Sequence, residues 1–600
     1  MPRTKSTRTK KNLQPKLVAP NDAPLTAPNG ASTNGATSKQ QLSSVIKSAR
    51  DIMRKDAGLN GDLDRLPQLS WVLFLKSYDD LEVRRETEAI MQGAPYKSVI
   101  PVGYRWRDWA ADENKGRTGE ELLNFVNNDL LPKLRSLNET DEQLVIAQLF
   151  GETNNRMLSG YLLRDVVNLV AKINFNSSDD IHTLSHLYES MLKEMRDAAG
   201  DSGEFYTPRP VVRFMVERVA PKLGERVLDP ACGTGGFLVE TFEYLYKQQH
   251  TAQDREILQT RSLFGVEKKP MPFLLGMMNL LLHGIERPNV RRDNALKNPL
   301  REIGDAERFD VIVTNPPFGG EEEKGIQDNF PSNTRAAETA ILFMQFIMRS
   351  LKQGGRGAVV VPNGTLFGDG VTARVKEMLL TEFNLHTIVR LPNGVFAPYT
   401  SIPTNLLFFD KTEPTREIWY YELPLPEGRK NYTKTQPLQF EEFAACAEWW
   451  SERVENERAW KFDFRAAYDK ARTDAKPFWD AAQLAEANAR DLARRGKEIE
   501  DAASELLKAK SKEHDKIALL NAQRAELRDQ ENAQWAIARE QQQKGDAIYW
   551  AIYNLDLKNP NRVDDYEHMP PEQLAADILE KEKRIAEIMG EIQQVLIGEA

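Results

Sequence analysis

The sequence predicts an α/β fold with a doubly wound sheet, preceded by a helical domain and followed by long helices. Between Asp201 and about Asp410, short apolar strands alternate with helical patterns, which is typical of a doubly wound sheet. The residues before this segment have helical apolar spacing, and the residues beyond Asp480 are rich in Ala, Glu, Lys, Arg and Gln. We therefore expect four regions: a disordered basic tail at 1–40, a helical domain at 41–200, an α/β catalytic domain at 201–470 and a helical region with coiled-coil character at 471–600.

Composition excludes several classes of protein. The chain has 600 residues, of which 41% are hydrophobic, and this is enough for several sizeable cores. The two cysteines, Cys232 and Cys446, exclude a disulfide framework and a cysteine-rich zinc site, so we expect no metal. The densest apolar run, 273–282, is shorter than a membrane span, and we recognise no secretory signal. We therefore expect a cytoplasmic protein without a membrane partner.

The first two regions differ in their apolar content. Residues 1–40 mix Lys, Arg, Thr, Ser, Pro, Asn and Ala with almost no large apolar residues, so burial cannot offset the entropy of ordering them. The next region carries apolar residues at helical spacing, with a buried helix expected from Leu66 to Leu75 and with Trp106 and Trp109 expected in the core. Its remaining apolar stripes consist of Val45, Ile46, Ile52, Leu162, Val166, Val167, Leu169 and Val170.

A glycine-rich turn follows the first expected strand of the α/β region. The strand covers 226–228, the turn runs from Asp229 to Leu238, and a helix follows at 239–248. Glycines allow a ligand to approach the backbone closely, and a helix N-terminus favours the carboxylate of that ligand. The glycine spacing differs from the dinucleotide fingerprint, and the chain has no Gly-Lys-Ser or Gly-Lys-Thr loop for a nucleoside triphosphate.

Two carboxylates follow the turn in an order that fits a nucleoside cofactor. Glu267 ends the second expected strand, at 262–266, where it can accept hydrogen bonds from both ribose hydroxyls. Asp293 precedes the next strand and can accept from an adenine amino group. Each of them alone fits a solvated loop carboxylate better than a cofactor ligand. Their order along the chain favours the cofactor interpretation.

The tetrapeptide Asn315-Pro316-Pro317-Phe318 ends the strand expected at 309–314. Proline stops strand pairing and leaves Asn315 at the carboxyl end of the strand, where open α/β sheets bind their ligands. An aryl amine is a poor nucleophile because its lone pair is conjugated with the ring. If the side-chain carbonyl of Asn315 and the backbone carbonyl of Pro316 each accept one N–H, the lone pair is freed for attack on an electrophilic methyl group.

Loss of the proton after this attack needs no strong general base, and Phe318 offers a stacking face for a planar base. The alternative interpretation of the tetrapeptide is an ordinary strand-to-turn signal with a core phenylalanine.

The order of these motifs resembles a known family. The segments 203–208 (Gly-Glu-Phe-Tyr-Thr-Pro), 229–237 (Asp-Pro-Ala-Cys-Gly-Thr-Gly-Gly-Phe) and 315–318 are similar to S-adenosylmethionine-dependent DNA adenine-N6 methyltransferases. More narrowly, they resemble the modification subunit of type I restriction-modification systems. Further matching segments lie at 354–363 and 391–400, and the resemblance covers roughly residues 45 to 470.

The resemblance implies a methyltransferase catalytic domain at 201–470 and a role for each motif residue. Asn315 and Pro316 would hold the amine of a base flipped out of the duplex, and Phe318 would stack on that base. Phe396 is either its second stacking face or a core aromatic. The implied cofactor is S-adenosylmethionine. Its methionine moiety would lie beside Tyr206, Thr207 and Pro208, and the cofactor would be lined by Asp229, Gly233 and Gly235. Glu267 would hold its ribose and Asp293 its adenine.

The charge of the chain bears on its partners. A formal net charge of −9 is unusual for an enzyme that grips duplex DNA alone, because such enzymes use clustered Lys and Arg to release counterions. No inserted recognition domain separates the motifs. We therefore expect a separate specificity subunit to choose the DNA sequence, with a second copy of this chain and a restriction subunit as further partners.

The region beyond Asp480 carries two series of apolar residues at coiled-coil spacing. We expect one helix for each series, separated by Pro560 and Pro570-Pro571 and paired with one another as an antiparallel hairpin. The outer face of this hairpin would dock on helices of the specificity subunit. The first series, interrupted only at Glu513, is Ala485, Leu492, Ile499, Leu506, Leu520 and Leu527, and the second is Leu574, Ile578, Ile585, Ile588, Ile592 and Val595.

Two alternative functions remain open from the residues alone. An Asn-Pro-Pro-aromatic site can also methylate an amine in RNA or a glutamine amide in protein. The helical region before the α/β domain and the coiled-coil region after it disfavour that substrate. The second alternative is a non-catalytic assembly scaffold, which the intact Asn315 and glycine turn disfavour.

Overall fold

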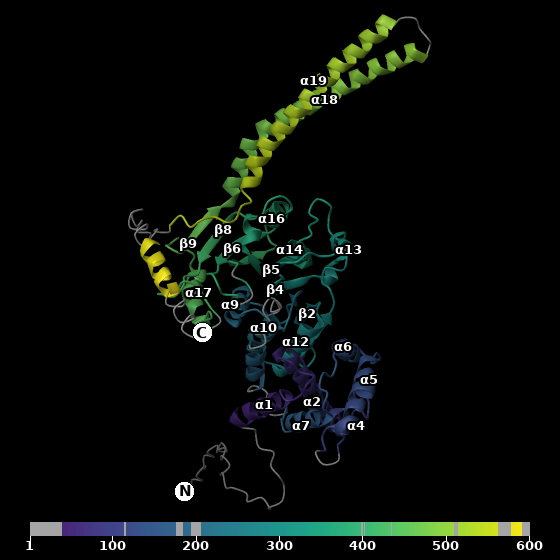
Figure 1. Cartoon of the computed structure of the whole chain (residues 1–600), viewed down its shortest axis with the longest axis vertical. Coiled ribbons are helices and arrows are strands. Elements are labelled where there is room, and N and C mark those ends of the chain that lie inside the picture. Colours follow the sequence, from purple (N-terminus) through teal and green to yellow (C-terminus); the bar gives the residue numbers. More distant parts are fainter. Residues whose placement is uncertain are drawn as a thin grey trace, which may run out of the picture.

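The computed structural model describes residues 39–112, 116–175, 184–193, 206–397, 400, 402–433, 435–508, 514–561 and 578–590. The basic tail predicted at 1–40 lies almost entirely outside this part of the chain. Figure 1 shows a central sheet with helices on both faces, a group of N-terminal helices at one end and a long helical hairpin that projects from the other end. This architecture agrees with the fold class expected from the sequence.

The described strands form one mixed sheet of nine strands in the order β3-β2-β1-β4-β5-β7-β6-β8-β9. The first five in this order are parallel, and β7 runs antiparallel to both of its neighbours. The carboxyl ends of β1 to β4 therefore lie along one edge of the sheet. The strands are β1 (Val227–Asp229), β2 (Leu263–Glu267), β3 (Asn289–Arg292), β4 (Phe309–Thr314), β5 (Leu351–Pro362), β6 (Asn384–Arg390), β7 (Thr404–Asp410), β8 (Glu417–Glu422) and β9 (Ala459–Asp463).

Alternate residues of the central strands are buried in two different cores, because successive side chains of a strand point to opposite faces. Val311 and Val313 of β4 belong to a core with α9, α10 and α12, whereas Ile312 packs in a second core with α14 and α16. A doubly wound sheet requires helices on both faces in this way. The helices are α9 (Arg209–Val219), α10 (Gly236–Tyr246), α11 (Ala252–Thr260), α12 (Pro270–Leu282), α13 (Lys324–Gln327), α14 (Thr339–Ser350), α15 (Asn363–Phe367), α16 (Val371–Glu382) and α17 (Ala444–Ser451).

The N-terminal helices form their own packing layer. The predicted core residues Trp106 and Trp109 are both buried, and their rings contact each other edge to face with centroids 5.4 Å apart. Thr140 and Ser159 each accept a hydrogen bond from a backbone N–H of the helix that follows, which fixes where α6 and α7 begin. The helices are α1 (Lys39–Met53), α2 (Asp62–Met91), α3 (Trp106–Trp109), α4 (Gly119–Asn124), a π-helical turn (Phe125–Leu130), α5 (Leu131–Arg135), α6 (Asp141–Phe150) and α7 (Gly160–Ala171).

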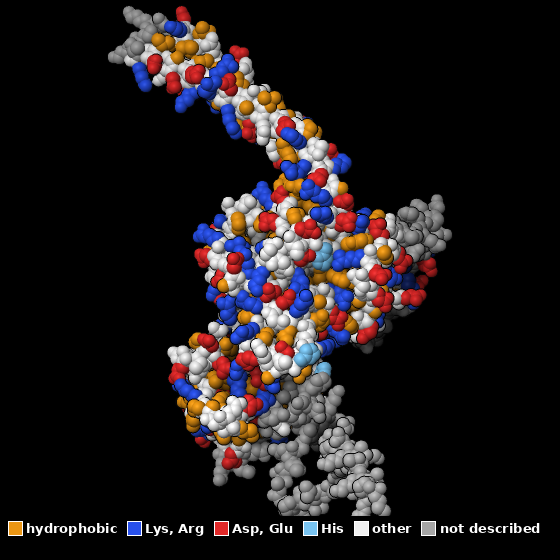
Figure 2. Space-filling model, turned by 180° about the vertical axis from the view of Figure 1, so that it is seen from behind, with side chains coloured by type: hydrophobic (Ala, Val, Ile, Leu, Met, Phe, Trp, Pro, Cys, Tyr) orange, Lys and Arg blue, Asp and Glu red, His pale blue; other side chains and the backbone are white. Residues whose placement is uncertain are grey.

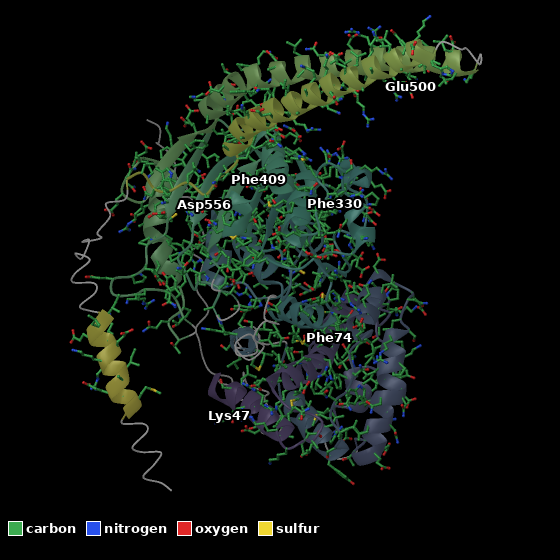
Figure 3. The ribbon with its side chains drawn as sticks, turned by 45° about the horizontal axis from the view of Figure 1, so that its top comes forward. Lys47, Phe74, Phe330, Phe409, Glu500 and Asp556 are labelled. Atoms are coloured by element: carbon green, nitrogen blue, oxygen red, sulfur yellow. The ribbon has the colours of Figure 1, made fainter. Side chains whose placement is uncertain are left out.

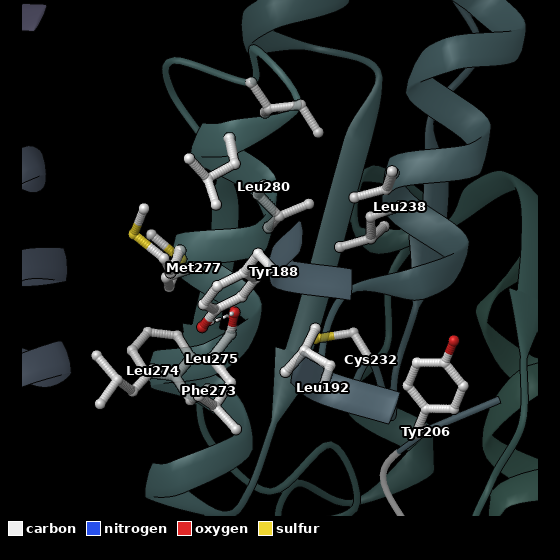
Figure 4. Close-up of a cluster of buried hydrophobic side chains, with 14 of the residues drawn as sticks. Tyr188, Leu192, Tyr206, Cys232, Leu238, Phe273, Leu274, Leu275, Met277 and Leu280 are labelled. Atoms are coloured by element: carbon white, nitrogen blue, oxygen red, sulfur yellow. Dashed lines mark hydrogen bonds between the residues drawn. The ribbon is translucent and has the colours of Figure 1, made fainter. Parts of the chain in front are cut away.

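The N-terminal helices pack directly on the sheet domain through α2 and α12. Tyr188, in the helix at 184–193, has its hydroxyl 2.9 Å from Ser70 Oγ of α2 and donates to the backbone oxygen of Leu275 in α12 at 3.3 Å. Figure 4 shows Tyr188 against Leu275, with Cys232 and Leu238 nearby. One continuous hydrophobic core therefore joins the helical layer to one face of the sheet.

The long hairpin consists of α18 (Phe464–Lys508) and α19 (His514–Ala551), which pack against each other along their length. Small residues allow the two helices to approach closely: a Cβ atom on Gly545 would lie 2.6 Å from the ring of Trp479. Arg524 of α19 forms an ion pair at 2.9 Å with Glu500, which Figure 3 labels toward the far end of the hairpin. The buried alanines of α18 are Ala471, Ala475, Ala482, Ala485, Ala489 and Ala503.

The expected pairing of this region is wrong. We expected one helix across 485–527 that pairs with a later helix at 574–595. Instead, α18 ends at Lys508 and the chain turns back, so Leu506 and Leu520 of the same heptad series lie on two different helices. Heptad spacing specifies an apolar seam but not whether the chain continues or reverses, and Glu513 interrupts the series in the segment between the two helices. Of the second series, only the helix at 578–590 is described.

The segment 552–561 returns from the hairpin to the sheet. Leu555 is fully buried, and its backbone N–H donates to the oxygen of Leu366 at 2.9 Å. Asp556, labelled in Figure 3 at the base of the hairpin, forms an ion pair with Arg390 at the end of β6 and accepts from Asn363 Nδ2 at 3.1 Å. The segment at the base of the hairpin is thus part of the core of the α/β domain.

Among the described helices, none is long and apolar enough to cross a membrane. Within the same residues, no group of three or more His, Cys, Asp or Glu side chains is placed to hold a metal ion.

Candidate active site

Asn315 lies directly after β4, at the carboxyl edge of the sheet, as its sequence context predicts. Its side-chain Nδ2 donates to Thr207 Oγ1 at 3.0 Å, although the two residues are 108 positions apart. A small pocket at this contact brings together the tetrapeptide, the glycine turn and the segment before α9. It is lined by Tyr206, Thr207, Arg209, Asp229, Ala231, Cys232, Thr234, Gly236, Phe237 and Asn315.

The other end of the Asn315 amide has no partner among the described residues. Its Oδ1 atom is buried and accepts no hydrogen bond from any described residue. A buried carbonyl oxygen without a donor costs free energy, and at the wall of a pocket a ligand can supply the missing donor. Pro316, which follows, is buried, and Pro317 is half-buried. The unpaired oxygen can therefore accept a hydrogen bond from a ligand in the pocket.

Asp229 ends β1 and contributes a buried carboxylate to the same pocket. Its Oδ1 accepts from Thr314 Oγ1 at 2.7 Å and from the Ala231 backbone N–H at 3.2 Å. Burial raises the pKa of this carboxyl to about 7, and the Thr314 hydrogen bond offsets only part of the effect. A cationic ligand in the pocket would favour the ionised form.

The glycine turn has the backbone geometry that its sequence predicts. Gly233 and Gly235 have φ values of 52° and 77°, a region that favours glycine, and Gly235 is the residue from which α10 begins. Asn279 of α12 holds the turn by donating to the backbone oxygen of Thr234 at 2.9 Å. The turn therefore presents the N-terminus of α10 beside the pocket.

Glu267 lies behind the glycine turn at the end of β2. Its Oε2 accepts from the Gly233 N–H at 2.9 Å and its Oε1 accepts from the Lys269 N–H at 2.6 Å. Burial raises the pKa of this carboxyl, and the backbone donors lower it in part. The carboxylate thus fixes the turn from the end of β2.

Asp293 follows β3 at the same edge of the sheet. Its backbone N–H donates to the backbone oxygen of Glu267 at 2.9 Å. Its side chain is 25% exposed and forms an ion pair with Lys297. Neither Glu267 nor Asp293 lines the small pocket around Asn315. The two acids therefore lie at the ends of neighbouring strands. Glu267 is two strands away from β4, and Asp293 is three strands away.

Phe318 and Phe396 lie against each other, with ring centroids 5.6 Å apart and an interplanar angle of 74°. Phe318 is half-buried, whereas Phe396 is only 4% exposed. Rings in edge-to-face contact leave no slot for a planar base between them. Stacking of a base on Phe318 therefore requires that the two rings move apart or that the base uses the open side of Phe318.

Sequence reasoning missed residues that support the site. Arg209, the first residue of α9, forms an ion pair with Glu189 and donates to the backbone oxygen of Gly236 at 2.7 Å. It thereby ties the helix at 184–193 to both the Tyr206-Thr207 segment and the glycine turn. Arg209 directly follows the motif at 203–208, and this position could have indicated a role at the site. Nothing in the sequence marks Glu189 as its partner.

A comparison with family models matches residues 179–491 to the model described as N-6 DNA Methylase, which is more than half of the chain. The chain belongs to the N-6 DNA methylase family. Residues 42–170 also match the model described as HsdM N-terminal domain. The family match spans the glycine turn, Glu267, Asp293 and the Asn315 tetrapeptide.

Several relatives of this N-6 DNA methylase are methylase subunits of type I restriction enzymes. The Type I restriction enzyme EcoEI methylase subunit of Escherichia coli is 51% identical over 433 residues, which cover 70% of this chain and 86% of that protein. The crystal structure of a modification subunit of a putative type I restriction enzyme from Vibrio vulnificus YJ016 is 59% identical, covers 72% of this chain and 94% of that one, and has a TM-score of 0.66.

A second solved structure, from work on complex assembly and conformational transition of the type I R-M system, matches more of the chain. It is 38% identical, covers 94% of this N-6 DNA methylase and 100% of that chain, and has a TM-score of 0.67. These findings confirm the expected family, the fold class and the expectation of an adenine-N6 DNA methyltransferase of the type I methylase-subunit group.

Proposed function

We propose that this chain methylates the N6 amine of an adenine flipped out of duplex DNA, with S-adenosylmethionine as methyl donor and with a specificity subunit choosing the sequence. One observation carries the proposal: the pocket that joins Asn315 to Thr207 and Asp229 holds a buried amide oxygen that no described residue satisfies. An acceptor in this state, at the edge where parallel strands end, matches an amine donor.

The residues beside Asn315 fit S-adenosylmethionine. Asp229 offers a buried carboxylate for the α-ammonium group, and the N-terminus of α10 favours the α-carboxylate through its backbone N–H groups. Tyr206, Thr207 and Pro208 would lie along the methionine moiety. The carboxylate of Glu267 suits the ribose hydroxyls as an acceptor. Asp293, one strand further along the edge, suits the adenine amino group.

Asn315 and Pro316 would activate the target amine. When bound, the cofactor supplies an electrophilic methyl group. The Oδ1 of Asn315 would accept one N–H of the amine and the backbone oxygen of Pro316 the other, which draws the nitrogen toward tetrahedral geometry and frees its lone pair. The new C–N bond forms first, and the proton then leaves from a nitrogen that has become strongly acidic. No strong base is therefore required of the chain.

Phe318 would receive the flipped base on its open side. Flipping costs a few kcal/mol of unstacking, and stacking on an aromatic ring recovers about 1–3 kcal/mol of it. We assign Phe396, which is almost fully buried against Phe318, to supporting that ring. A second stacking face on Phe396 would require a rearrangement of the pair.

We propose that DNA binding by this chain relies on a specificity subunit, with a second copy of the chain and a restriction subunit as further partners. The relatives are named as methylase or modification subunits of type I enzymes. Figure 2 shows Lys and Arg interspersed with Asp and Glu on the visible face, and the formal net charge is −9. Mixed charge of this kind provides little of the counterion release that drives binding to a duplex.

The hairpin and the helix at 578–590 are the proposed docking surface for the specificity subunit. Both carry large apolar side chains that are exposed to solvent. Their apolar spacing suits packing against helices of another chain. The exposed residues are Leu484, Leu507, Leu519 and Ile537 on the hairpin and Ile578, Leu579, Ile585, Ile588 and Met589 on the helix.

Replacement of Asn315 by alanine tests the reaction. The change removes the amide acceptor but leaves the glycine turn intact, so methyl transfer to unmethylated duplex DNA should fall by about 100-fold or more while S-adenosylmethionine affinity stays within a few-fold. Asn333→Ala, at an exposed asparagine of the same domain, is the matched control and should behave as the original chain. Near-normal transfer by Asn315→Ala would overturn the proposal, and so would methylation of RNA or protein in preference to DNA.

A further inference from the structure

A side-chain amide has two different ends, and only one of them can serve the proposed reaction. In Asn315 the Nδ2 end faces Thr207, where it donates to Oγ1 at 3.0 Å, and the Oδ1 end is buried without a donor among the described residues. A half-turn about the last torsion of the side chain would exchange the two ends at almost no steric cost. An NH2 group would then face the amine, and two donors cannot form a hydrogen bond.

We propose that Thr207 is a positioning residue, whose hydroxyl oxygen accepts from Asn315 Nδ2 while the carbonyl end of the amide faces the target amine. The hydroxyl could also donate to Oδ1 of a reversed amide, but only the observed arrangement gives both Nδ2 and the amine an acceptor. The inference rests on the proposed function, which assigns Oδ1 the role of acceptor. Thr207 lies in the segment just before α9, whereas Asn315 follows β4, so the contact exists only in the folded chain. This role is additional to any contact of Thr207 with the cofactor.

The hydroxyl acts through the far end of the amide. When an amine donates to Oδ1, the Nδ2 group must also find an acceptor, because a buried N–H without a partner is costly. Thr207 Oγ1 supplies that acceptor. Hydrogen bonds in series also polarise one another, so donation from Nδ2 increases the negative charge on Oδ1 and strengthens its bond to the amine. Both effects are largest when the amine is being activated.

The surrounding contacts hold Thr207 in place. Arg209, two residues further on, is fixed by its ion pair with Glu189 and by its hydrogen bond to the Gly236 oxygen at 2.7 Å. Tyr206, on the other side, is buried. Thr207 therefore lies between two anchored residues, and its hydroxyl is placed opposite the amide.

The test compares Thr207→Val with Thr207→Ser in the full chain, assembled with its specificity subunit, on unmethylated plasmid DNA. Valine keeps the shape of threonine and removes the hydroxyl, whereas serine keeps the hydroxyl and removes the methyl group. Single-turnover methylation at saturating S-adenosylmethionine should fall roughly 10- to 100-fold in Thr207→Val and less than about 3-fold in Thr207→Ser. Cofactor affinity is measured separately by calorimetry. Any contact that Thr207→Val loses with the methionine moiety lowers that affinity, whereas the rate at saturating cofactor reports on the Asn315 contact.

Other outcomes overturn the inference. A normal rate in Thr207→Val, or equal losses in the valine and serine variants, would show that the hydroxyl does not position Asn315. A loss confined to cofactor affinity would assign Thr207 to the cofactor alone. Failure of the inference is distinguishable from failure of the proposed function, because Asn315→Ala reports on the function independently: an inactive Asn315→Ala with a normal Thr207→Val removes only the role of Thr207.

An Asn315→Asp background sharpens the result. A carboxylate has two equivalent acceptor oxygens and no N–H, so it needs no acceptor from Thr207. In that background Thr207→Val should reduce the remaining rate by less than about 3-fold, compared with the larger loss beside Asn315. An equal loss in both backgrounds would overturn the inference, and if Asn315→Asp has no measurable rate, the valine and serine comparison decides alone.

Discussion

The Glu267 carboxylate accepts a hydrogen bond from the backbone N–H of Gly233 at 2.9 Å, so the acid that ends β2 holds the glycine turn that follows β1. A residue expected to bind the ribose thus also shapes the turn. Direct binding of the ribose needs the ribose hydroxyls, whereas support of the turn does not.

Replacement of Glu267 by alanine should weaken S-adenosylmethionine binding by roughly 10- to 100-fold, because hydrogen bonds to a charged group are lost from both the turn and the cofactor. The transfer rate at saturating cofactor should fall less. Calorimetry with a cofactor analogue that lacks one ribose hydroxyl separates the two roles. If Glu267 contacts the ribose, the analogue should bind the original chain more weakly than S-adenosylmethionine does, and the two should bind Glu267→Ala equally. The same loss of affinity for the analogue in both proteins would assign Glu267 to support of the turn alone.

The pH dependence of cofactor binding should follow Asp229. Burial raises the pKa of its carboxyl to about 7, and the ionised form is the one that attracts an ammonium group. Because the folded chain without ligand holds the proton below this pH, binding must release it, and affinity should decrease by up to about tenfold for each unit below pH 7 and level off above it. Calorimetric titrations between pH 5.5 and about 8.5 measure this profile.

Asp229→Asn is the matched control for that profile. The amide retains the size of the side chain and cannot ionise, so the variant should bind the cofactor more weakly at pH 8 and lose the difference as the pH falls well below 7. An unchanged pH profile in Asp229→Asn would assign the titration to another group.

Phe318→Ala should reduce methylation of duplex DNA by roughly 5- to 150-fold, since the stacking face for the flipped base is lost, and Phe318→Trp should retain most of the rate. The loss in Phe318→Ala should be smaller on a duplex with a mismatched target adenine, because such a base is already partly unstacked and costs less to flip. Single-turnover rates on the two duplexes provide the measurement. Equal damage from alanine and tryptophan on both duplexes would indicate that the contact with Phe396 serves packing only.

Removal of the outer part of the hairpin should abolish binding of the specificity subunit and leave cofactor binding intact. The deletion joins α18 to α19 with a short Gly-Ser turn in place of 491–533, so that Trp479 keeps its contacts with Gly545 and Asp546 at the base. Co-purification with the specificity subunit and calorimetry with S-adenosylmethionine are the two measurements. A retained complex would place the docking surface elsewhere, with the helix at 578–590 as the remaining candidate.

Deletion of all residues from 480 to 600 is a poor version of the same experiment. It also removes Tyr553 and Leu555, which are fully buried in the core behind the sheet. Loss of large buried side chains costs about 2–5 kcal/mol each, so the α/β domain itself would be weakened. The outer deletion avoids this loss because it ends before the returning segment.

Several features of the chain were predictable from short stretches of sequence. The strand before Asp229, the strand before Asn315 and the glycine turn between them depend on local patterns: β-branched runs, proline as a strand stop and glycines at positive φ. The buried tryptophans of the N-terminal region follow from apolar spacing in the same way. Ala485, expected in the apolar seam, is buried as predicted. The expected continuous helix through 485–527 is not observed.

The sequence by itself determined which residues end the strands, and therefore that Asn315, Asp229 and Glu267 would meet at one edge of a parallel sheet. Only the tertiary structure decided that Thr207 holds the Asn315 amide, that Arg209 pairs with Glu189 and that the long hairpin folds back after Lys508. The physical reason is the range of the interactions. Backbone propensity and strand termination act between near neighbours, whereas these contacts join residues that are distant in sequence and have no local pattern to mark them.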